Sequence, residues 1–174
     1  IGMLFQSSAL FDSLSVLENV LFPLRMFATM AESEMLDRAQ LCLKRVNIEG
    51  KDKLFPSEIS GGMQKRVGIA RAIAMNPQYL FVDEPNSGLD PQTSIVIDNL
   101  INEITVEYGM TTIMITHDMN SVMEAGDNIL FIHEGKAWWQ GTRQELLVSD
   151  NPELNAFIFA SGLMRKVREA MGKG

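Results

Sequence analysis

The stretch "YLFVDEPNSGLD", Tyr79 to Asp90, runs from four apolar residues directly into two adjacent carboxylates. A short apolar run of this kind is typical of a buried strand, and Asp83 and Glu84 stand where that strand should end. Asp90 is a suitable helix N-cap, and Pro91 suits the first helical position. The stretch therefore predicts a buried strand, a polar turn and the start of a helix.

Strand and helix patterns alternate on both sides of this stretch. The expected strands are Ile1 to Phe5, Tyr79 to Val82, Thr111 to Thr116, Ile129 to His133 and Lys136 to Gln140. The expected helices start near Ser15, Ser33, Ser60, Asp90 and Met119, with Pro23 bending or interrupting the first. A capping-box pair, Thr142 and Glu145, opens a helical tail that runs to Gly174. Strands separated by helices imply parallel pairing through βαβ crossovers.

Length and composition limit the classes of protein to consider. With 174 residues, of which 46% are hydrophobic and 21% charged, the default is one globular domain. The net charge is −7 and the basic residues are scattered, so nucleic acid is not expected as a partner. Cys42 is the single cysteine and falls on the apolar side of a helical pattern, which fits a core position in a reducing compartment. No apolar run approaches the ~20 residues that a membrane-spanning helix needs, so membrane contact is expected through a partner.

The stretch "SEISGGMQKRVGIARA", Ser57 to Ala72, places a Ser-Gly-Gly step at the start of a helical pattern. The first N–H groups of such a helix are unpaired and its dipole is positive there, which favours an anion. Gly61 and Gly62 let a ligand approach the backbone closely, and the Ser60 hydroxyl can donate to an oxygen. The ligand that suits this arrangement is a phosphate. Taken alone, a serine N-cap followed by two glycines is usually an ordinary helix start.

Four polar side chains at strand ends are further candidates. Asp83 could hold Mg²⁺ while Glu84 faces an attacking water, because alternation along a strand aims neighbouring side chains in different directions. His117 ends the next strand, where its imidazole could donate to a γ-phosphate, and the Gln6 amide could reach a metal or a water. Each has an ordinary explanation when taken alone: a solvated acidic turn, a surface histidine or a polar strand end.

The order of these features resembles that in the nucleotide-binding subunit of an ABC transporter. Gln6 matches the Q-loop, "ISGGMQKR" the signature motif, "LFVDE" the Walker B motif, "SGLD" the D-loop and His117 the switch histidine. The resemblance covers nearly all of residues 1–141. It implies an α/β fold, a P-loop NTPase-like cassette with a mainly parallel sheet and a helical signature subdomain. One domain would comprise the Q-loop and signature region (1–76), the Walker B to H-loop sheet region (77–141) and a helical tail (142–174).

The resemblance also implies an ATPase mechanism with ATP and Mg²⁺ as cofactors. Two copies would sandwich two ATP molecules, each held by the P-loop of one subunit and by Ser60, Gly61 and Gly62 of the other. Asp83 would hold Mg²⁺, and Glu84 would orient and deprotonate the attacking water. His117 would steady the γ-phosphate, Gln6 would bind or sense the metal and the γ-phosphate, and Asp90 would link the two sites.

A narrower resemblance rests on "LFQSSALFDSLSVLENVLFPLR", Leu4 to Arg25, which is similar to the ATPase subunits of MCE-type lipid transporters. These Mla-like systems move phospholipid between the bacterial inner and outer membranes, and in them this stretch contacts the membrane subunit. Met63, in place of the family-wide Gln, fits the same branch. The implied partners are a second ATPase subunit, an integral-membrane permease and, through the complex, an MCE-type lipid-binding protein. The implied location is peripheral, on the cytoplasmic face of the inner membrane.

One family motif is missing from the sequence, since no Gly-x-x-x-x-Gly-Lys-[Ser/Thr] P-loop occurs. In the family this motif lies upstream of the Q-loop. We therefore expect that Ile1 is not the native start, and that the chain lacks the P-loop strand and by itself binds ATP poorly and hydrolyses almost none. A non-catalytic cassette remnant acting as a binding module is an alternative, as is another importer-type ABC ATPase. A soluble ABC ATPase of translation or DNA repair should show a second cassette or long coiled coils, and neither is present.

Overall fold

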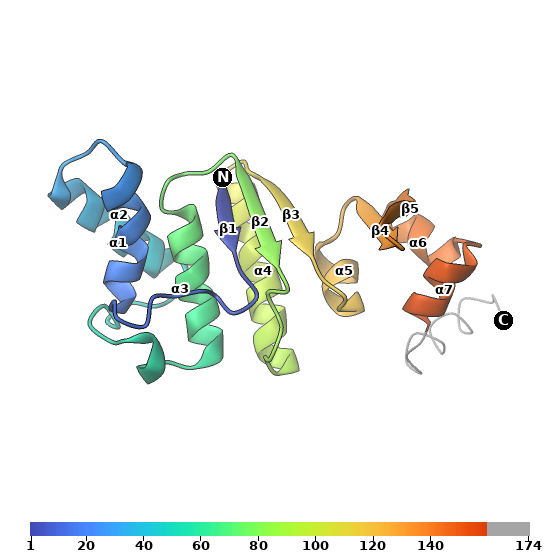
Figure 1. Cartoon of the computed structure of the whole chain (residues 1–174), viewed down its shortest axis with the longest axis horizontal. Coiled ribbons are helices and arrows are strands. Elements are labelled where there is room, and N and C mark those ends of the chain that lie inside the picture. The colour runs from blue at the N-terminus through green and yellow to red at the C-terminus, as the bar shows by residue number, and fades with distance from the viewer. Residues whose placement is uncertain (160–174) are drawn as a thin grey trace. The chain divides into compact units, whose positions relative to one another are not determined.

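The computed structural model describes residues 1–159, which belong to two compact units (Figure 1). The first unit comprises Ile1–His117, and the second begins at Asp118. Each unit has its own sheet and its own hydrophobic core. Within the described residues, no helix is long and apolar enough to cross a membrane.

The sheet of the first unit consists of three parallel strands in the order β1-β2-β3. They are β1 (Gly2–Leu4), β2 (Tyr79–Asp83) and β3 (Thr111–Ile115), at the expected places. Leu4 pairs with Val82 and Val82 with Met114, so the carboxyl ends of the strands lie at one edge. Val82 is fully buried, whereas Ile113 and Ile115 are 43% and 57% exposed. One face of the sheet is therefore covered, and the other exposes apolar side chains.

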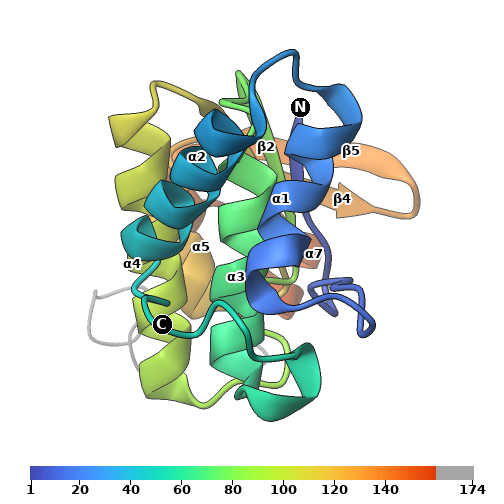
Figure 2. The ribbon, with the colours of Figure 1, turned by 90° about the vertical axis from the view of Figure 1, so that its left-hand side faces the viewer.

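The helices of the first unit surround one central helix (Figure 2). They are α1 (Val16–Phe27), α2 (Glu32–Arg45), the short 3₁₀ helix Pro56–Glu58, α3 (Gly61–Ile73) and α4 (Pro91–Glu107). α3 contacts α1, α2, α4 and β1. Its buried residues are Gly62, Lys65, Val67, Gly68, Ile69, Ala70, Ala72 and Ile73. They lie around most of the helix rather than along a single stripe, because α3 is packed on several sides.

The helix starts are confirmed where a side chain caps the first turn. Ser15 and Glu18 form the expected capping box, with Ser15 N donating to Glu18 Oε2 at 2.8 Å and Glu18 N donating to Ser15 Oγ at 3.3 Å. Pro23 was expected to bend or interrupt α1; the helix is not interrupted, since α1 runs through this residue. Val20 and Leu24, on either side of Pro23, are buried. Tertiary packing of α1 therefore outweighs the hydrogen bond that proline removes.

The second unit contains a hairpin and three helices in its described residues. They are α5 (Met119–Ala125), β4 (Ile129–His133), β5 (Lys136–Gly141), α6 (Arg143–Val148) and α7 (Pro152–Ile158). β4 and β5 are antiparallel, and the turn between them at Glu134 and Gly135 has φ values of 50° and 71°, as a two-residue type I′ turn requires. The expected capping box at Thr142 and Glu145 is present. The part of the helical tail expected after residue 159 lies outside the described residues.

Candidate functional site

Gln6 and Glu84 meet at the carboxyl edge of the sheet because they follow adjacent parallel strands. β1 ends at Leu4 and β2 at Asp83, and the two strands pair directly. The Gln6 side-chain Nε2 donates to Ser87 Oγ at 3.3 Å, in the turn that follows Glu84. In open parallel sheets this edge is where ligands bind. Two of the predicted site residues therefore lie in one place.

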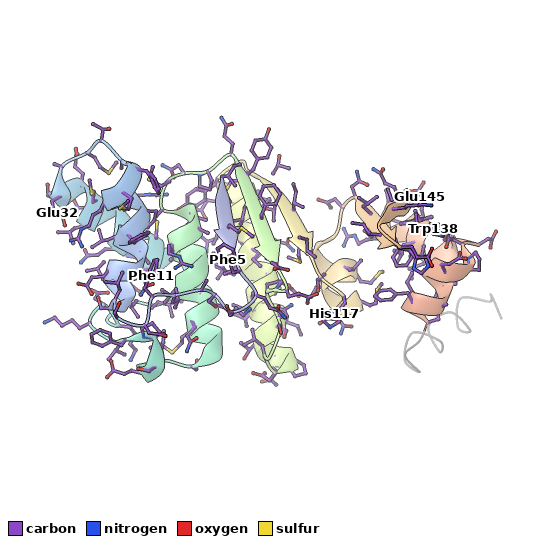
Figure 3. All side chains as sticks on the ribbon, viewed as in Figure 1. Phe5, Phe11, Glu32, His117, Trp138 and Glu145 are labelled. Carbon is purple, nitrogen blue, oxygen red and sulfur yellow. The ribbon has the colours of Figure 1, made fainter. Side chains whose placement is uncertain are left out.

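Glu84 is directed toward His117 by the turn after β2. Its backbone N–H donates to Ile115 O at 2.9 Å, and its φ of 44° lies in the left-handed region. Glu84 Oε1 lies 2.7 Å from His117 Nδ1, and the two side chains are 19% and 76% exposed, respectively. Figure 3 shows His117 just beyond the end of β3. A carboxylate hydrogen-bonded to an imidazole at this edge can orient a water and contact a phosphate.

Asp83 and Glu84 take their directions from different causes. The expected alternation along one strand does not apply to both, because β2 ends at Asp83 and Glu84 belongs to the turn. Asp83 is half-buried on the less covered face of β2. Its carboxylate fits Mg²⁺, which prefers oxygen ligands and accompanies phosphates. No group of three or more His, Cys, Asp or Glu side chains in the described residues could form a metal centre, so an ion at Asp83 would need phosphate and water oxygens as well.

Ser60 caps α3, as predicted, because its Oγ accepts a backbone N–H of the first turn at 3.3 Å. The two glycines that follow differ in what the fold requires of them. A Cβ at Gly62 would lie 2.7 Å from Thr93 Cγ2, so close packing against α4 accounts for this glycine. A Cβ at Gly61 would meet nothing nearer than Leu89 Cδ2 at 3.7 Å, an ordinary contact. Packing within the described residues gives no reason for Gly61, and its close approach to a ligand stays a prediction.

Asp90 is the N-cap of α4, as its position before Pro91 predicted. Its carboxylate accepts from the backbone N–H groups of Gln92 at 3.1 Å and Thr93 at 3.0 Å. The Thr93 hydroxyl also donates to it, and this bond is the main cause of the lowered pKa of Asp90. The local fold thus accounts for an aspartate here, and its contact across a dimer stays a prediction.

Lys65 belongs to the site but was not among the predicted residues. It is 4% exposed, and its Nζ donates to Gln6 O and to Glu84 O, the latter at 3.2 Å. Burial lowers the pKa of this lysine. The sequence did indicate that Lys65 is buried. It shares a helical face with the small and apolar residues Gly68 and Ile69, and such a face is expected to pack against the core.

The loop between β1 and α1 is organised by Asn19, which is fully buried. Its Oδ1 accepts from Phe11 N at 2.8 Å, and its Nδ2 donates to the carbonyls of Phe11, Leu14 and Ser15 at 3.1, 3.0 and 3.0 Å. This single side chain supplies partners to a segment that has no strand pairing. Asn19 therefore determines the path of the loop that follows Gln6.

Replacing Asn19 with Leu should lower the free energy of unfolding by about 1–3 kcal/mol, because a buried N–H and the carbonyls around it lose this partner. The midpoint of urea or thermal unfolding measures the loss. Gln40→Leu, at an exposed position of α2, is the matched control and should change little. Equal midpoints for the two variants would contradict this role of Asn19.

Comparisons with known proteins agree on one family. Residues 1–87 match the sequence profile of the family described as ABC transporter. The protein named "Probable ribonucleotide transport ATP-binding protein mkl" of Mycobacterium leprae is 40% identical over 157 residues, which are 90% of this chain and 45% of that protein. "Methionine import ATP-binding protein MetN" of Desulfitobacterium hafniense is 43% identical over 148 residues, 85% of this chain and 43% of that protein. "Protein TRIGALACTOSYLDIACYLGLYCEROL 3, chloroplastic" of Arabidopsis thaliana is 38% identical over 177 residues, 92% of this chain and 51% of that protein.

A solved structure resembles the chain in both sequence and fold. It is the dimeric structure of a post-hydrolysis state of an ATP-binding cassette bound to ADP and Pi. The identity is 34% and the TM-score 0.72, over 82% of this chain and 62% of the other. The chain spans about half the length of the curated relatives it matches.

Proposed function

Because this chain belongs to the ABC transporter family, we propose that it is part of the ATP-hydrolysing subunit of a bacterial transporter that moves phospholipid between membranes. The observation that carries the catalytic part of the proposal is the 2.7 Å contact between Glu84 and His117. It lies at the carboxyl edge of the sheet, where Gln6 is also held. An acid, an imidazole and an amide at this edge suit the hydrolysis of a bound nucleotide.

In the proposed reaction a water attacks the γ-phosphorus of ATP and the bond to the β–γ bridging oxygen breaks, which leaves ADP and phosphate. This chain supplies groups that position the water. Glu84 orients the water and takes its proton. In its doubly protonated form, His117 would donate from Nδ1 to Glu84 and from its other ring nitrogen to the γ-phosphate. The oxygen atoms of Asp83 and Gln6 would hold Mg²⁺, which would neutralise charge on the phosphates. Catalysis is then chiefly positioning and charge stabilisation.

Each ATP is proposed to lie between two subunits, held by the P-loop of one and by Ser60 and Gly61 of the other. The exposed start of α3 supports this, since packing within the chain gives no reason for Gly61. Among the described residues, β3 pairs with β2 along one of its edges. The segment that carries the P-loop is proposed to pair with the opposite edge of β3. A segment packed there would cover the exposed side chains of Ile113 and Ile115.

The stretch from Leu4 to Arg25 supports phospholipid as the substrate, because it is similar to the ATPase subunits of MCE-type lipid transporters. Directly after it, Met26 and Phe27 at the end of α1 are 59% and 72% exposed and offer an apolar surface to a permease. The proposed partners are a second copy of the subunit, an integral-membrane permease and, through the complex, an MCE-type lipid-binding protein. The cassette would then lie on the cytoplasmic face of the inner membrane as a peripheral subunit.

The names of the relatives favour a second candidate substrate class. The mycobacterial protein is named for ribonucleotide transport and MetN for methionine import, whereas the Arabidopsis protein carries the name of a glycolipid. An importer of a small polar molecule is therefore the alternative to a lipid transporter. A cassette remnant that does not hydrolyse ATP is a further alternative, and a reading frame that encodes a P-loop upstream of Ile1 would exclude it.

The test is transport by the full-length protein, purified with its membrane subunit and placed in phospholipid vesicles. We expect Mg²⁺-dependent ATP hydrolysis and ATP-dependent transfer of fluorescent phospholipid to acceptor vesicles. Glu84→Gln is the inactive control. Hydrolysis that methionine or a ribonucleotide stimulates, without lipid transfer, would establish the alternative substrate class. Absence of hydrolysis in the intact complex would refute the ATPase itself.

A further inference from the structure

The central helix α3 carries a buried cation, Lys65, and a half-buried one, Arg71, whose side chains bond to main-chain carbonyls of other segments. Lys65 reaches the carbonyls of Gln6 and Glu84, as described above. Arg71, two turns later, reaches the loop that follows Gln6. Neither side chain has a place in the proposed chemistry, and burying a cation is costly unless it is well bonded.

Lys65 bridges the segments that follow β1 and β2, just beyond the last paired residues of the two strands. The register between β1 and β2 ends at Leu4 and Val82, so the residues beyond that pair have no shared ladder. Gln6 and Glu84 lie just past this point, and one ammonium group donates to both of their carbonyls. An ammonium has three donors and no acceptor, which suits two carbonyls that converge on one atom.

The charge of Lys65 is subject to two opposing effects. Burial lowers its pKa, and the negative charges of Asp83 and Glu84 act against that change. The same two carboxylates are the ones proposed to hold Mg²⁺ and to orient the water. The cation therefore lies within the electrostatic field of the reacting groups, although it is bonded to backbone atoms.

Arg71 extends the same attachment along the loop. Its Nη1 donates to Ala9 O at 2.7 Å and its Nη2 to Ser8 O at 2.6 Å. Ser8 and Ala9 have φ values of 63° and 43°, in the left-handed region that such residues rarely adopt. Contacts from α3 hold this conformation, so the loop after Gln6 is fixed to α3 at two places.

We propose that Lys65 is a positioning residue that sets Gln6 and Glu84 relative to each other, so that a movement of the loop after Gln6 changes the alignment of the Glu84 carboxylate. This inference rests on the proposed ATPase function. Through the main chain, Lys65 connects the loop proposed to contact the membrane subunit with the residue proposed to orient the water. Its contribution is alignment, since the hydrogen bonds described above join it to carbonyl oxygens and not to a reacting side chain.

The test uses Lys65→Met in the full-length protein, because Met fills a similar volume and has no donor. We expect kcat for ATP hydrolysis to fall by about tenfold or more and KM to change by less than about threefold, since misalignment affects the chemical step. Lys65→Arg, which keeps N–H donors and charge, should recover most of kcat. Lys44→Met on α2, where the lysine side chain is 71% exposed, is the matched control and should behave as wild type.

A second measurement tests the hydrogen bonds of Lys65 to Gln6 and Glu84 without requiring ATP hydrolysis. Amide hydrogen exchange at residues 6–9 and 84–87 should be faster in Lys65→Met, with the protection of α4 unchanged. If Lys65→Met does not fold, Lys65→Leu, which is shorter and also has no donor, replaces it with the same expectations. A kcat within about twofold of wild type overturns the proposal, and so does a rise in KM alone or faster exchange throughout the chain. An inactive wild-type protein would refute the proposed ATPase function instead. Hydrogen exchange at residues 6–9 and 84–87 would then show whether Lys65 holds these two segments.

Discussion

Glu84→Gln in the full-length protein is expected to lower ATP turnover by a factor of about 10²–10⁴ while ATP binding is retained. The amide keeps the shape of the side chain and can still hydrogen-bond His117 Nδ1, which lies 2.7 Å from Glu84 Oε1 in the present structure. It cannot take a proton from the attacking water. The loss should therefore appear in kcat, with little change in nucleotide affinity.

Steady-state hydrolysis and equilibrium binding of a fluorescent ATP analogue measure the two quantities separately. Glu49→Gln, at an exposed position whose only described partner is Lys44 at 4.0 Å, is the matched control for removing a carboxylate charge. We expect it to hydrolyse ATP as wild type does. Near-normal turnover in Glu84→Gln would remove Glu84 from the role of general base.

Gly61→Asp is expected to abolish ATP-dependent dimerisation without unfolding the chain. A Cβ at this position meets only Leu89 Cδ2 at 3.7 Å, so the fold can accommodate a side chain. An aspartate in the first turn of α3 also favours the helix through its dipole. The same negative charge would oppose a phosphate held at the start of α3, so closure around ATP should fail.

Sedimentation with and without ATP, in a Glu84→Gln background that retains ATP, measures the effect of Gly61→Asp. Ser33→Asp places the same charge in the first turn of α2 and should leave dimerisation intact. Gly62→Asp should behave differently from Gly61→Asp and lower the unfolding midpoint, because its Cβ would lie 2.7 Å from Thr93 Cγ2. Normal ATP-dependent dimerisation of Gly61→Asp would exclude the start of α3 from the nucleotide sandwich.

The cassette fold and the positions of its elements could be predicted because their signals are local. Ser15, Ser60, Asp90 and Thr142 cap helices as expected, since an N-cap is decided by a side chain and the next three residues. The short apolar runs of β1, β2 and β3 likewise identified the strands. The structural likeness to a dimeric ATP-binding cassette confirms the fold class that the ordered motifs implied.

Where the structure adds to or differs from these expectations, the cause lies outside the local segment. Pro23 was expected to bend or interrupt α1, and the helix is not interrupted, because its buried neighbours keep it continuous. Both glycines after Ser60 were interpreted as openings for a ligand, and packing against Thr93 accounts for one of them. Strand alternation was expected to direct Glu84, which instead lies in a left-handed turn. In each case a contact with another element outweighed the local pattern.

The sequence by itself determined which residues are polar at strand ends, where the helices start and which family the order of motifs resembles. Only the tertiary structure decided that Lys65 bonds to Gln6 and Glu84, and that Glu84 contacts His117. The physical reason is distance along the chain. Gln6 and Lys65 are 59 residues apart and Glu84 and His117 are 33 apart, so no periodicity or capping rule links them until parallel strands bring their ends to one edge.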